Sequence, residues 1–282
     1  MTEWPLVLFT VAIQLACGLA LTTTLCDRST QRLAEAHMRP LGMAIFPVAA
    51  AGMLLSLLHV GRPLLAFRSL YNLRNSRLSL EILLTVLFAL AAFVYSRAWW
   101  KNISRNRLAC GEVASVLGVA AVVSSAAVYL VPVQPAWNSG WVPVSFLGTT
   151  LLLGGFAAIA FADLPADRIL RRGFLAGTAS GGVLLLISAT WMVLHVARPS
   201  ADDFVAAQLE RALHVVAAHH SVWLGIFLFL AAVVPIAFAI RMWPSPERGV
   251  PRLELRIVFG CVLLGALVGR ALMYALGTPY PF

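Results

Sequence analysis

Ionisable side chains gather at one short connection between two apolar stretches, in residues 57–81. The first stretch closes with His59, and the second opens with Ser79 and Glu81. Between them lie four arginines, Arg62, Arg68, Arg74 and Arg77. Ionisable groups at the edge of a hydrocarbon phase are costly, so they are candidates for function by default. A histidine can exchange a proton near neutral pH and a carboxylate can take it onward, so this stretch predicts acid–base chemistry beside lipid.

Quinol oxidation is a reaction that such a pair could serve. It needs a hydrogen-bond partner at each ring oxygen, a route for two protons and an apolar slot for the tail. His59 and Glu81, on adjacent helix ends, fit both polar roles. Arg270, at similar depth in the last apolar stretch, could restrain Glu81 electrostatically or form a structural ion pair with it.

Each of these residues also has a structural interpretation. His59 could be an interfacial side chain, and Glu81 a first-turn acid that favours the positive end of its helix. Ser79 could cap the same helix. For the arginine connection, the alternative is snorkelling of the side chains to lipid phosphates.

Composition defines the elements that must position these residues. The protein is 60% hydrophobic and 12% charged, whereas a soluble domain is roughly a quarter charged. A membrane span needs about 20 apolar residues. We therefore predict an all-α polytopic membrane protein, a single integral membrane domain over residues 1–282. Its eight predicted spans are about 5–25, 41–60, 78–96, 111–131, 144–163, 173–196, 219–240 and 257–276.

The basic residues indicate the orientation of these spans. Fourteen lie in the loops after spans one, three, five and seven, and six in the loops after spans two, four and six. The positive-inside rule places the first group in the cytoplasm and both termini outside. The net charge of +9 is thus a topology signal and predicts no nucleic-acid partner. The outer arginine connection opposes this signal, so we expect it to dock a partner or to line a site.

A short motif that occurs twice indicates two parallel halves. LHVGRP at 58–63 and LHVARP at 194–199 lie 136 residues apart, each at the outer end of a predicted span. Parallel repeats are a known pattern in membrane proteins. The repeated motif predicts four-helix halves of about 1–135 and 136–282.

Metal and transport functions are less well supported. The four cysteines are scattered, which disfavours an iron–sulfur cluster or structural zinc in this protein. His59 and His195 could face each other and hold one outer haem, but there is no second, inner pair. A secondary transporter would need midplane charges on broken helices, whereas here the charges cluster at one face.

Longer motifs resemble the membrane anchor subunit of bacterial dimethyl sulfoxide reductase and its relatives. The similar segments cover most of the sequence, including the serine–glutamate pair at 79–81 and the Trp/Pro-rich segment at 131–143. The others are EWPLVLFT at 3–10, SLLHVGRPLLAFRSL at 56–70 and LVGRALMY at 267–274. One departure is Leu65, where the family often has an arginine two positions before the residue matching Phe67.

The resemblance implies eight spans, outward termini and no haem or metal in this subunit. It implies oxidation of menaquinol near the outer face of a bacterial inner membrane. Electrons would pass to a periplasmic iron–sulfur subunit with four 4Fe–4S clusters and then to a molybdopterin catalytic subunit. By motif, the catalytic pair falls on His59 and Glu81. We expect the whole quinol pocket to comprise His59, Gly61, Arg62, Phe67, Arg68, Ser79, Glu81 and Arg270.

Two alternatives within the same family remain. The protein could serve a complex with another terminal substrate, such as polysulfide, thiosulfate, tetrathionate or an oxyanion. It could also work in the opposite direction, as a quinone reductase. If His59 and Glu81 are not the site, the second-half histidines His195, His219 and His220 are the next candidates.

The charge asymmetry generates a topology prediction. Reporter fusions after residues 35, 104, 170 and 248 should signal cytoplasm, and fusions near 137 and 206 should signal periplasm. The physical reason is that basic loops are retained on the cytoplasmic side during insertion. Reversed reporter signals would place Glu81 near the cytoplasm and overturn the outer site.

Overall fold

A computed structural model describes residues 4–29, 37–58, 71–162, 168–245 and 250–277. These segments are helices and short connections, and none of them contains a strand. Helices dominate because the hydrocarbon interior offers no water to hydrogen-bond with an open backbone. The predictions for His59, Gly61, Arg62, Phe67 and Arg68 lie outside the described residues.

Eight described helices are long and apolar enough to cross a membrane, as predicted. Seven of them are α1 (Trp4–Ser29), α3 (Arg39–Leu57), α4 (Arg77–Trp100), α5 (Arg107–Val128), α6 (Trp141–Phe161), α7 (Arg168–Val196) and α11 (Arg252–Gly277). The other is composite, with α9 (Ser221–Leu228), the π-turn η3 (Phe229–Val233) and α10 (Val234–Met242). Between α7 and α9 lie α8 (Asp203–His214) and the π-turn η2 (Val215–His219).

Several spans begin earlier than hydropathy predicts. The structure starts α5 at Arg107 and α7 at Arg168, whereas the apolar pattern starts at 111 and 173. A helix of 29 residues such as α7 is about 44 Å long, well beyond a hydrocarbon layer of about 30 Å. The first turns of α5 and α7, which carry arginines, are therefore helical although they extend beyond the apolar pattern.

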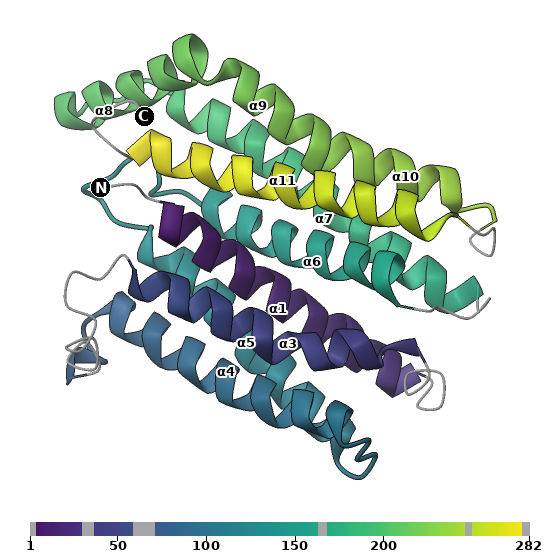
Figure 1. The fold of residues 1–282 in the computed structure, drawn as a ribbon. Helices are drawn as coiled ribbons and strands as arrows, with labels where there is room; N and C mark the ends of the chain where they lie inside the picture. Colours follow the sequence, from purple (N-terminus) through teal and green to yellow (C-terminus); the bar gives the residue numbers. More distant parts are fainter. Residues whose placement is uncertain (1–3, 30–36, 59–70, 163–167, 246–249, 278–282) are drawn as a thin grey trace.

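The helices form two sets of four. In the first set, α1 contacts α3 and α5, while α4 packs against both of these neighbours. In the second set, α6 contacts α7 and α11, and the composite span packs between them. Helices α1 and α6 join the sets and run side by side through the centre (Figure 1). The second copy of the LHV motif, at 194–196, closes α7, whereas the first copy lies outside the described residues except for Leu58, so the repeat stays a prediction.

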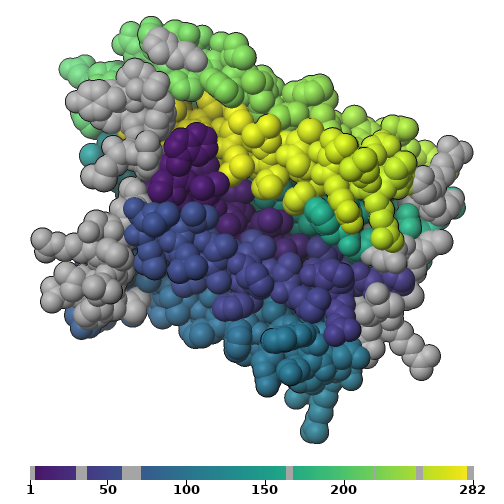
Figure 2. All heavy atoms as spheres, viewed as in Figure 1, coloured from purple at the N-terminus to yellow at the C-terminus, as the bar shows by residue number. Residues whose placement is uncertain are grey.

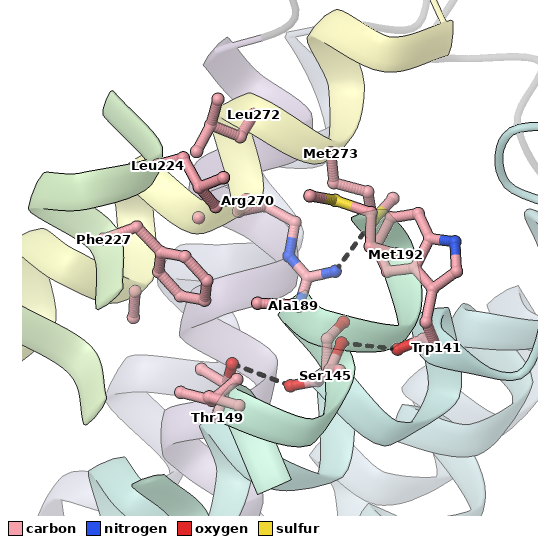
Figure 3. A pocket seen from close by; sticks show the side chains of 14 residues that line it. Trp141, Ser145, Thr149, Ala189, Met192, Leu224, Phe227, Arg270, Leu272 and Met273 are labelled. Atoms are coloured by element: carbon pink, nitrogen blue, oxygen red, sulfur yellow. Dashed lines mark hydrogen bonds between the residues drawn. The ribbon is translucent and has the colours of Figure 1, made fainter. Parts of the chain in front are cut away.

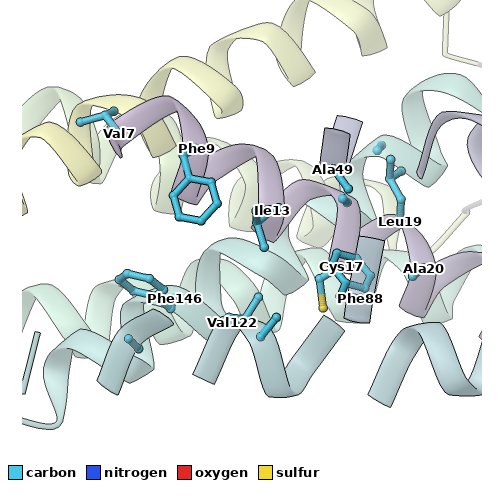
Figure 4. Packing of buried hydrophobic residues seen from close by; sticks show 14 of the residues in the cluster. Val7, Phe9, Ile13, Cys17, Leu19, Ala20, Ala49, Phe88, Val122 and Phe146 are labelled. Atoms are coloured by element: carbon cyan, nitrogen blue, oxygen red, sulfur yellow. The ribbon is translucent and has the colours of Figure 1, made fainter. Parts of the chain in front are cut away.

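Small residues allow the central helices to approach closely. A Cβ atom added at Gly154 would lie 2.4 Å from the Gly18 carbonyl oxygen, and one added at Gly18 would lie 2.4 Å from the Thr150 oxygen. Close backbone approach of this kind is typical of membrane helix interfaces. In the space-filling view, α1 is visible only between α3 and α11 (Figure 2). Its apolar side chains, such as Phe9, Ile13 and Cys17, extend into the buried core (Figure 4).

A buried ion pair connects α1 to α5 in the first set, where α1 ends and α5 begins. The Arg107 guanidinium donates to both carboxylate oxygens of Asp27, at 3.0 and 2.7 Å, and both side chains are fully buried. It also stacks on the Trp99 ring, 4.1 Å from the centroid. The predicted spans, 5–25 and 111–131, left both Asp27 and Arg107 in loops. That interpretation was wrong, because both residues lie inside helices that face each other.

Removing one member of this pair should destabilise the fold. Arg107→Met should lower the free energy of unfolding by about 3–5 kcal/mol, because the Asp27 charge would stay buried without its partner. The double variant Asp27→Leu/Arg107→Met should recover most of that loss. The measurement is thermal unfolding of the purified protein in detergent.

Arg28→Met is the matched control. Arg28 pairs with Glu112 at 3.5 Å, but the two side chains are 71% and 47% exposed, so little stability should be lost. Equal effects of Arg28→Met and Arg107→Met would contradict a special role for the buried pair.

Candidate functional site

Glu81 lies one turn inside α4, at the end of the bundle where the polypeptide begins. The Ser76 side chain caps this helix by accepting a hydrogen bond from the Ser79 backbone nitrogen at 3.2 Å. The expectation that Ser79 is the cap and Glu81 a first-turn acid was therefore wrong. The reason is that α4 begins at Arg77, so Glu81 is its fifth residue. Its position is too deep for a simple interaction with the helix end.

The Glu81 carboxylate is buried between α4 and α5. Its side chain accepts a hydrogen bond of 2.5 Å from the Ser125 hydroxyl, and the residue is only 7% exposed. Among the described residues, no basic side chain forms an ion pair with it. Ser79 is buried on the same turn. A buried carboxylate whose described partner is a hydroxyl can exchange a proton with a ligand bound beside it.

The structure describes two arginines of the connection, Arg74 and Arg77, and their surroundings differ. Arg74 is exposed to the surroundings of the protein. Arg77 instead donates to the carbonyl oxygen of Ala127 at 3.1 Å and to that of Leu130. A cation at a helix C-terminus stabilises its free carbonyls, so Arg77 caps α5 and ties it to α4.

Arg270 is buried in α11 and does not form the ion pair considered with Glu81. Its Nη2 donates to the Gln14 Oε1 atom of α1 at 3.1 Å, and the guanidinium lies 3.5 Å from the Phe146 ring centroid. Its Nη1 lies 3.1 Å from the Met273 sulfur. The pair is absent because α11 belongs to the second set of helices and presents Arg270 to α1 and α6. Arg270 thus joins the two sets beside the region of Glu81.

A small cavity lies beside Arg270, with a volume of about 30 Å³ (Figure 3). The hydroxyls on its wall donate to backbone carbonyls, as Ser188 does to Trp141 at 2.8 Å and Thr149 to Ser145 at 2.9 Å. Their lone pairs and the Arg270 nitrogens offer both acceptors and donors. A volume of this size holds about two water molecules and cannot hold a quinol ring.

Two tyrosines connect the Glu81 region to the second set of helices. Tyr129 follows α5 one turn after Ser125, and its hydroxyl hydrogen-bonds to that of Tyr274 in α11. Trp137 packs edge-on against both rings, with centroid distances of 5.4 and 6.2 Å. Sequence reasoning missed this cluster, since tyrosines at span ends are ordinary interfacial residues.

The Trp/Pro-rich segment at 131–143 is hydrogen-bonded to α11 and α7 at the same end of the bundle as Glu81. Gln134 donates to the Gly277 carbonyl at 3.0 Å, and Trp137 donates to that of Met273 at 2.7 Å. The Nε2 atom of His195 lies 2.8 Å from the Pro135 carbonyl oxygen. A carbonyl can only accept, so His195 donates through Nε2 and links α7 to this segment.

The other histidines give little support for a metal site. His220 Nδ1 contacts the Val215 carbonyl at 3.2 Å, and the His219 side chain lies outside the described parts. Within the described ranges, no group of three or more histidine, cysteine or acidic residues could hold a metal ion. His195 uses Nε2 for its backbone partner, which leaves only Nδ1 for any other ligand.

Comparison with known proteins identifies the family. Residues 1–276 match the family described as DMSO reductase anchor subunit (DmsC). The protein belongs to this family. It is an anchor subunit of the dimethyl sulfoxide reductase type, with eight helices suited to a multi-pass membrane protein.

Its relatives carry matching names. The C subunit of the anaerobic dimethyl sulfoxide reductase of Escherichia coli (strain K12) is 28% identical over 291 residues, covering 97% of this protein and 94% of the relative. The anaerobic dimethyl sulfoxide reductase subunit YnfH of the same strain is 28% identical over 285 residues, with the same coverage. The C subunit of the Haemophilus influenzae enzyme is 29% identical over 161 residues, or 54% of this protein and 56% of the relative.

The Tyr129–Tyr274 hydrogen bond should couple the two sets of helices. Tyr129→Phe and Tyr274→Phe should each lower the free energy of unfolding by about 1 kcal/mol, because one buried hydroxyl loses its partner while the ring packing is kept. The double variant should be no less stable than either single variant, since both changes remove the same interaction. Thermal unfolding in detergent measures all three.

Tyr95→Phe provides the control for this cycle. The Tyr95 hydroxyl is buried near the other end of α4 and meets Thr24 at 3.4 Å, so it shares no contact with Tyr129. Its effect should add to that of Tyr129→Phe. Simple additivity between Tyr129→Phe and Tyr274→Phe would show that the hydroxyls do not act as a pair.

Proposed function

We propose that this anchor subunit oxidises a quinol at Glu81 and His59 and passes the electrons to partner subunits. The observation that carries the proposal is the buried Glu81 carboxylate, one turn inside α4, with the Ser125 hydroxyl as its described partner. Buried intramembrane carboxylates are costly and mark functional sites. Arg77 and the Tyr129–Tyr274 bond fix α5, which carries Ser125, so the carboxylate has a defined position.

The proposed chemistry follows from the two residue types. Oxidation of one quinol releases two protons and two electrons and leaves the quinone. Glu81 accepts the proton of one ring hydroxyl, and the neutral imidazole of His59 accepts the hydrogen bond and then the proton of the other. The electrons leave to the iron–sulfur partner, and the protons leave by the same end of the bundle.

The remaining pocket residues have supporting roles in this proposal. Ser79 lies on the Glu81 turn, and Gly61, Arg62, Phe67 and Arg68 occupy the connection after His59. Arg270 does not touch Glu81, so we assign it to the adjoining wall, where it joins α11 to α1. Tyr129 lies one turn after Ser125, and Tyr274 lies one turn after Arg270 in α11, so their hydrogen bond connects the helix that holds Glu81 to the helix that carries Arg270.

Family membership supports the choice of partners. The relatives are named as subunits of anaerobic dimethyl sulfoxide reductases, and an anchor subunit implies catalytic and iron–sulfur partners. We propose menaquinol as the substrate, a subunit with four 4Fe–4S clusters as the electron acceptor and a molybdopterin subunit as the site of terminal reduction. We propose that these partners lie on the periplasmic side of a bacterial inner membrane, because the basic asymmetry of the loops predicts that the Glu81 end faces outward.

The arginine connection is proposed as part of the docking face for the iron–sulfur subunit. Arg74 is exposed and available for such a contact. Arg77 is excluded from this role, because it caps the carbonyls at the end of α5. The docking function therefore falls on Arg74 and on the arginines that precede it in the connection.

Replacing either proton acceptor should abolish quinol-driven turnover. His59→Leu and Glu81→Gln should each slow reduction of the terminal acceptor by about 100-fold or more, the usual cost of losing one proton-transfer group. Ser125→Ala should give a smaller loss, up to about tenfold, because it removes one hydrogen bond to Glu81. The measurement is turnover of the purified complex with a menaquinol analogue.

Two controls make this result specific. An artificial donor that reduces the partner subunits directly should support normal activity in all three variants. Glu112→Gln, at an exposed carboxylate in α5, should leave quinol-driven turnover unchanged. Near-normal quinol turnover in both His59→Leu and Glu81→Gln, with the complex intact, would move the site to the histidines of the second set.

A further inference from the structure

The cavity beside Arg270 brings together hydrogen-bonding side chains from three helices of the second set. The Arg270 side chain points into it from α11, Ser145 and Thr149 line it from α6, and Ser188 lines it from α7 (Figure 3). Arg270 and Thr149 are 4% exposed and Ser188 is 3% exposed. These polar groups are therefore removed from both lipid and bulk water, and their partners must lie inside the protein.

One donor of Arg270 has no partner among the described residues. Its Nη2 atom donates to Gln14 Oε1 at 3.1 Å, and Nη1 lies 3.1 Å from the Met273 sulfur, whereas the buried Nε atom meets no described acceptor. A buried donor without an acceptor is costly, and in folded proteins nearly all such groups bond to protein or to ordered water. The Nε atom thus indicates a ligand within the cavity.

The hydroxyls that line the cavity offer acceptors to this ligand. Ser145, Thr149 and Ser188 each donate to a backbone carbonyl oxygen, at 2.7, 2.9 and 2.8 Å. Their protons are therefore in use, and their remaining lone pairs can accept hydrogen bonds. A ligand that satisfies the whole cavity must accept a hydrogen bond from Arg270 Nε and donate hydrogen bonds to the hydroxyl oxygens.

Water meets both requirements. A chloride ion, which a buried guanidinium would also attract, can only accept hydrogen bonds and would face the lone pairs of the hydroxyls. An apolar ligand would leave the Arg270 Nε atom without a partner. A buried water needs two to four polar partners and about 10–15 Å³ of space. The cavity has the partners, and its volume of about 30 Å³ has room for two molecules.

We propose that this cavity is a hydration site, in which two bound water molecules bridge Arg270 Nε to the hydroxyls of α6 and α7. The bridge ties α11 to both of these helices. Since Arg270 also bonds to Gln14 of α1, it extends the contact between the two sets of helices into the second set. The site is independent of the quinol chemistry proposed at Glu81, and its test requires no turnover.

Radiolytic labelling detects such waters directly. An X-ray pulse splits bound water into hydroxyl radicals, which oxidise the nearest side chains, and methionine readily becomes the sulfoxide. Met192 and Met273 line the cavity and are only 6% and 2% exposed, so radicals from bulk solvent do not reach them. Met38 is 0% exposed and does not line the cavity, which makes it the internal reference. In the complex purified with its partner subunits, Met192 and Met273 should be oxidised about tenfold faster than Met38.

Two neighbouring threonines of α6 provide a matched pair of variants. Thr149 and Thr150 are both buried, and each donates to the carbonyl oxygen four residues earlier at 2.9 Å, but Thr150 does not line this cavity. Thr149→Val should lower the oxidation of Met192 and Met273 at least about twofold, because a bound water loses one of its polar partners. Thr150→Val should leave the oxidation unchanged.

Arg270→Leu removes the donor and should reduce the oxidation of Met192 and Met273 to the rate of Met38. The threonine pair keeps the proposal testable if Arg270→Leu does not fold, because valine preserves the shape of the threonine side chain. Wild-type oxidation of Met192 and Met273 at the rate of Met38 would show a dry cavity and overturn the proposal. Equal effects of the two valine variants would also overturn it.

A change of anion separates water from chloride. Replacing gluconate by chloride in the buffer should leave the oxidation of Met192 and Met273 unchanged, because water occupies the cavity in both buffers. Oxidation that falls as the chloride concentration rises would assign the cavity to an anion and would overturn the hydration site.

Discussion

The close contact between α1 and α6 is the interaction on which the rest of the structure depends. Gly18 and Gly154 leave room for backbone against backbone, and each would clash if it carried a side chain. In lipid, helices gain little from hydrophobic burial alone, so close packing and polar contacts must hold them together. The two sets of helices therefore meet along one line, and the buried charged groups near that line take partners from neighbouring helices.

Polar side chains fasten the bundle at both ends of this contact. At one end, the Asp27–Arg107 ion pair holds α1 to α5 inside the first set. At the other end, Arg270 bonds to Gln14 and so connects α11 to α1 across the two sets. A buried charge without a partner would cost several kcal/mol, so these contacts define which helices can be neighbours.

The proposed site uses the rigidity of the helices around Glu81. Glu81 is held by Ser125, and α5 is held by Arg77 at its end and by the bond from Tyr129 to Tyr274. A proton acceptor acts efficiently only when its position relative to the substrate is fixed. The second set of helices thus contributes to the geometry around Glu81 without supplying the carboxylate itself.

The sequence by itself determined the class of protein, the number of spans and the family, and it supplied the residues of the proposed site. Hydropathy is a local property, since each stretch of about 20 apolar residues must cross the bilayer wherever it packs. Motifs around His59 and Glu81 are local in the same way. The beginnings of the helices were predicted less accurately, because arginines in the first turns lowered the hydropathy of residues that are helical.

Only the tertiary structure decided which polar groups meet. Ser125 lies 44 residues from Glu81, and Gln14 lies 256 residues from Arg270, so neither contact leaves a sequence pattern. The partner of a buried side chain depends on which faces of two helices touch, and packing alone determines that rotation. For the same reason the predicted spans left Asp27 and Arg107 in loops, although the fold buries them against each other.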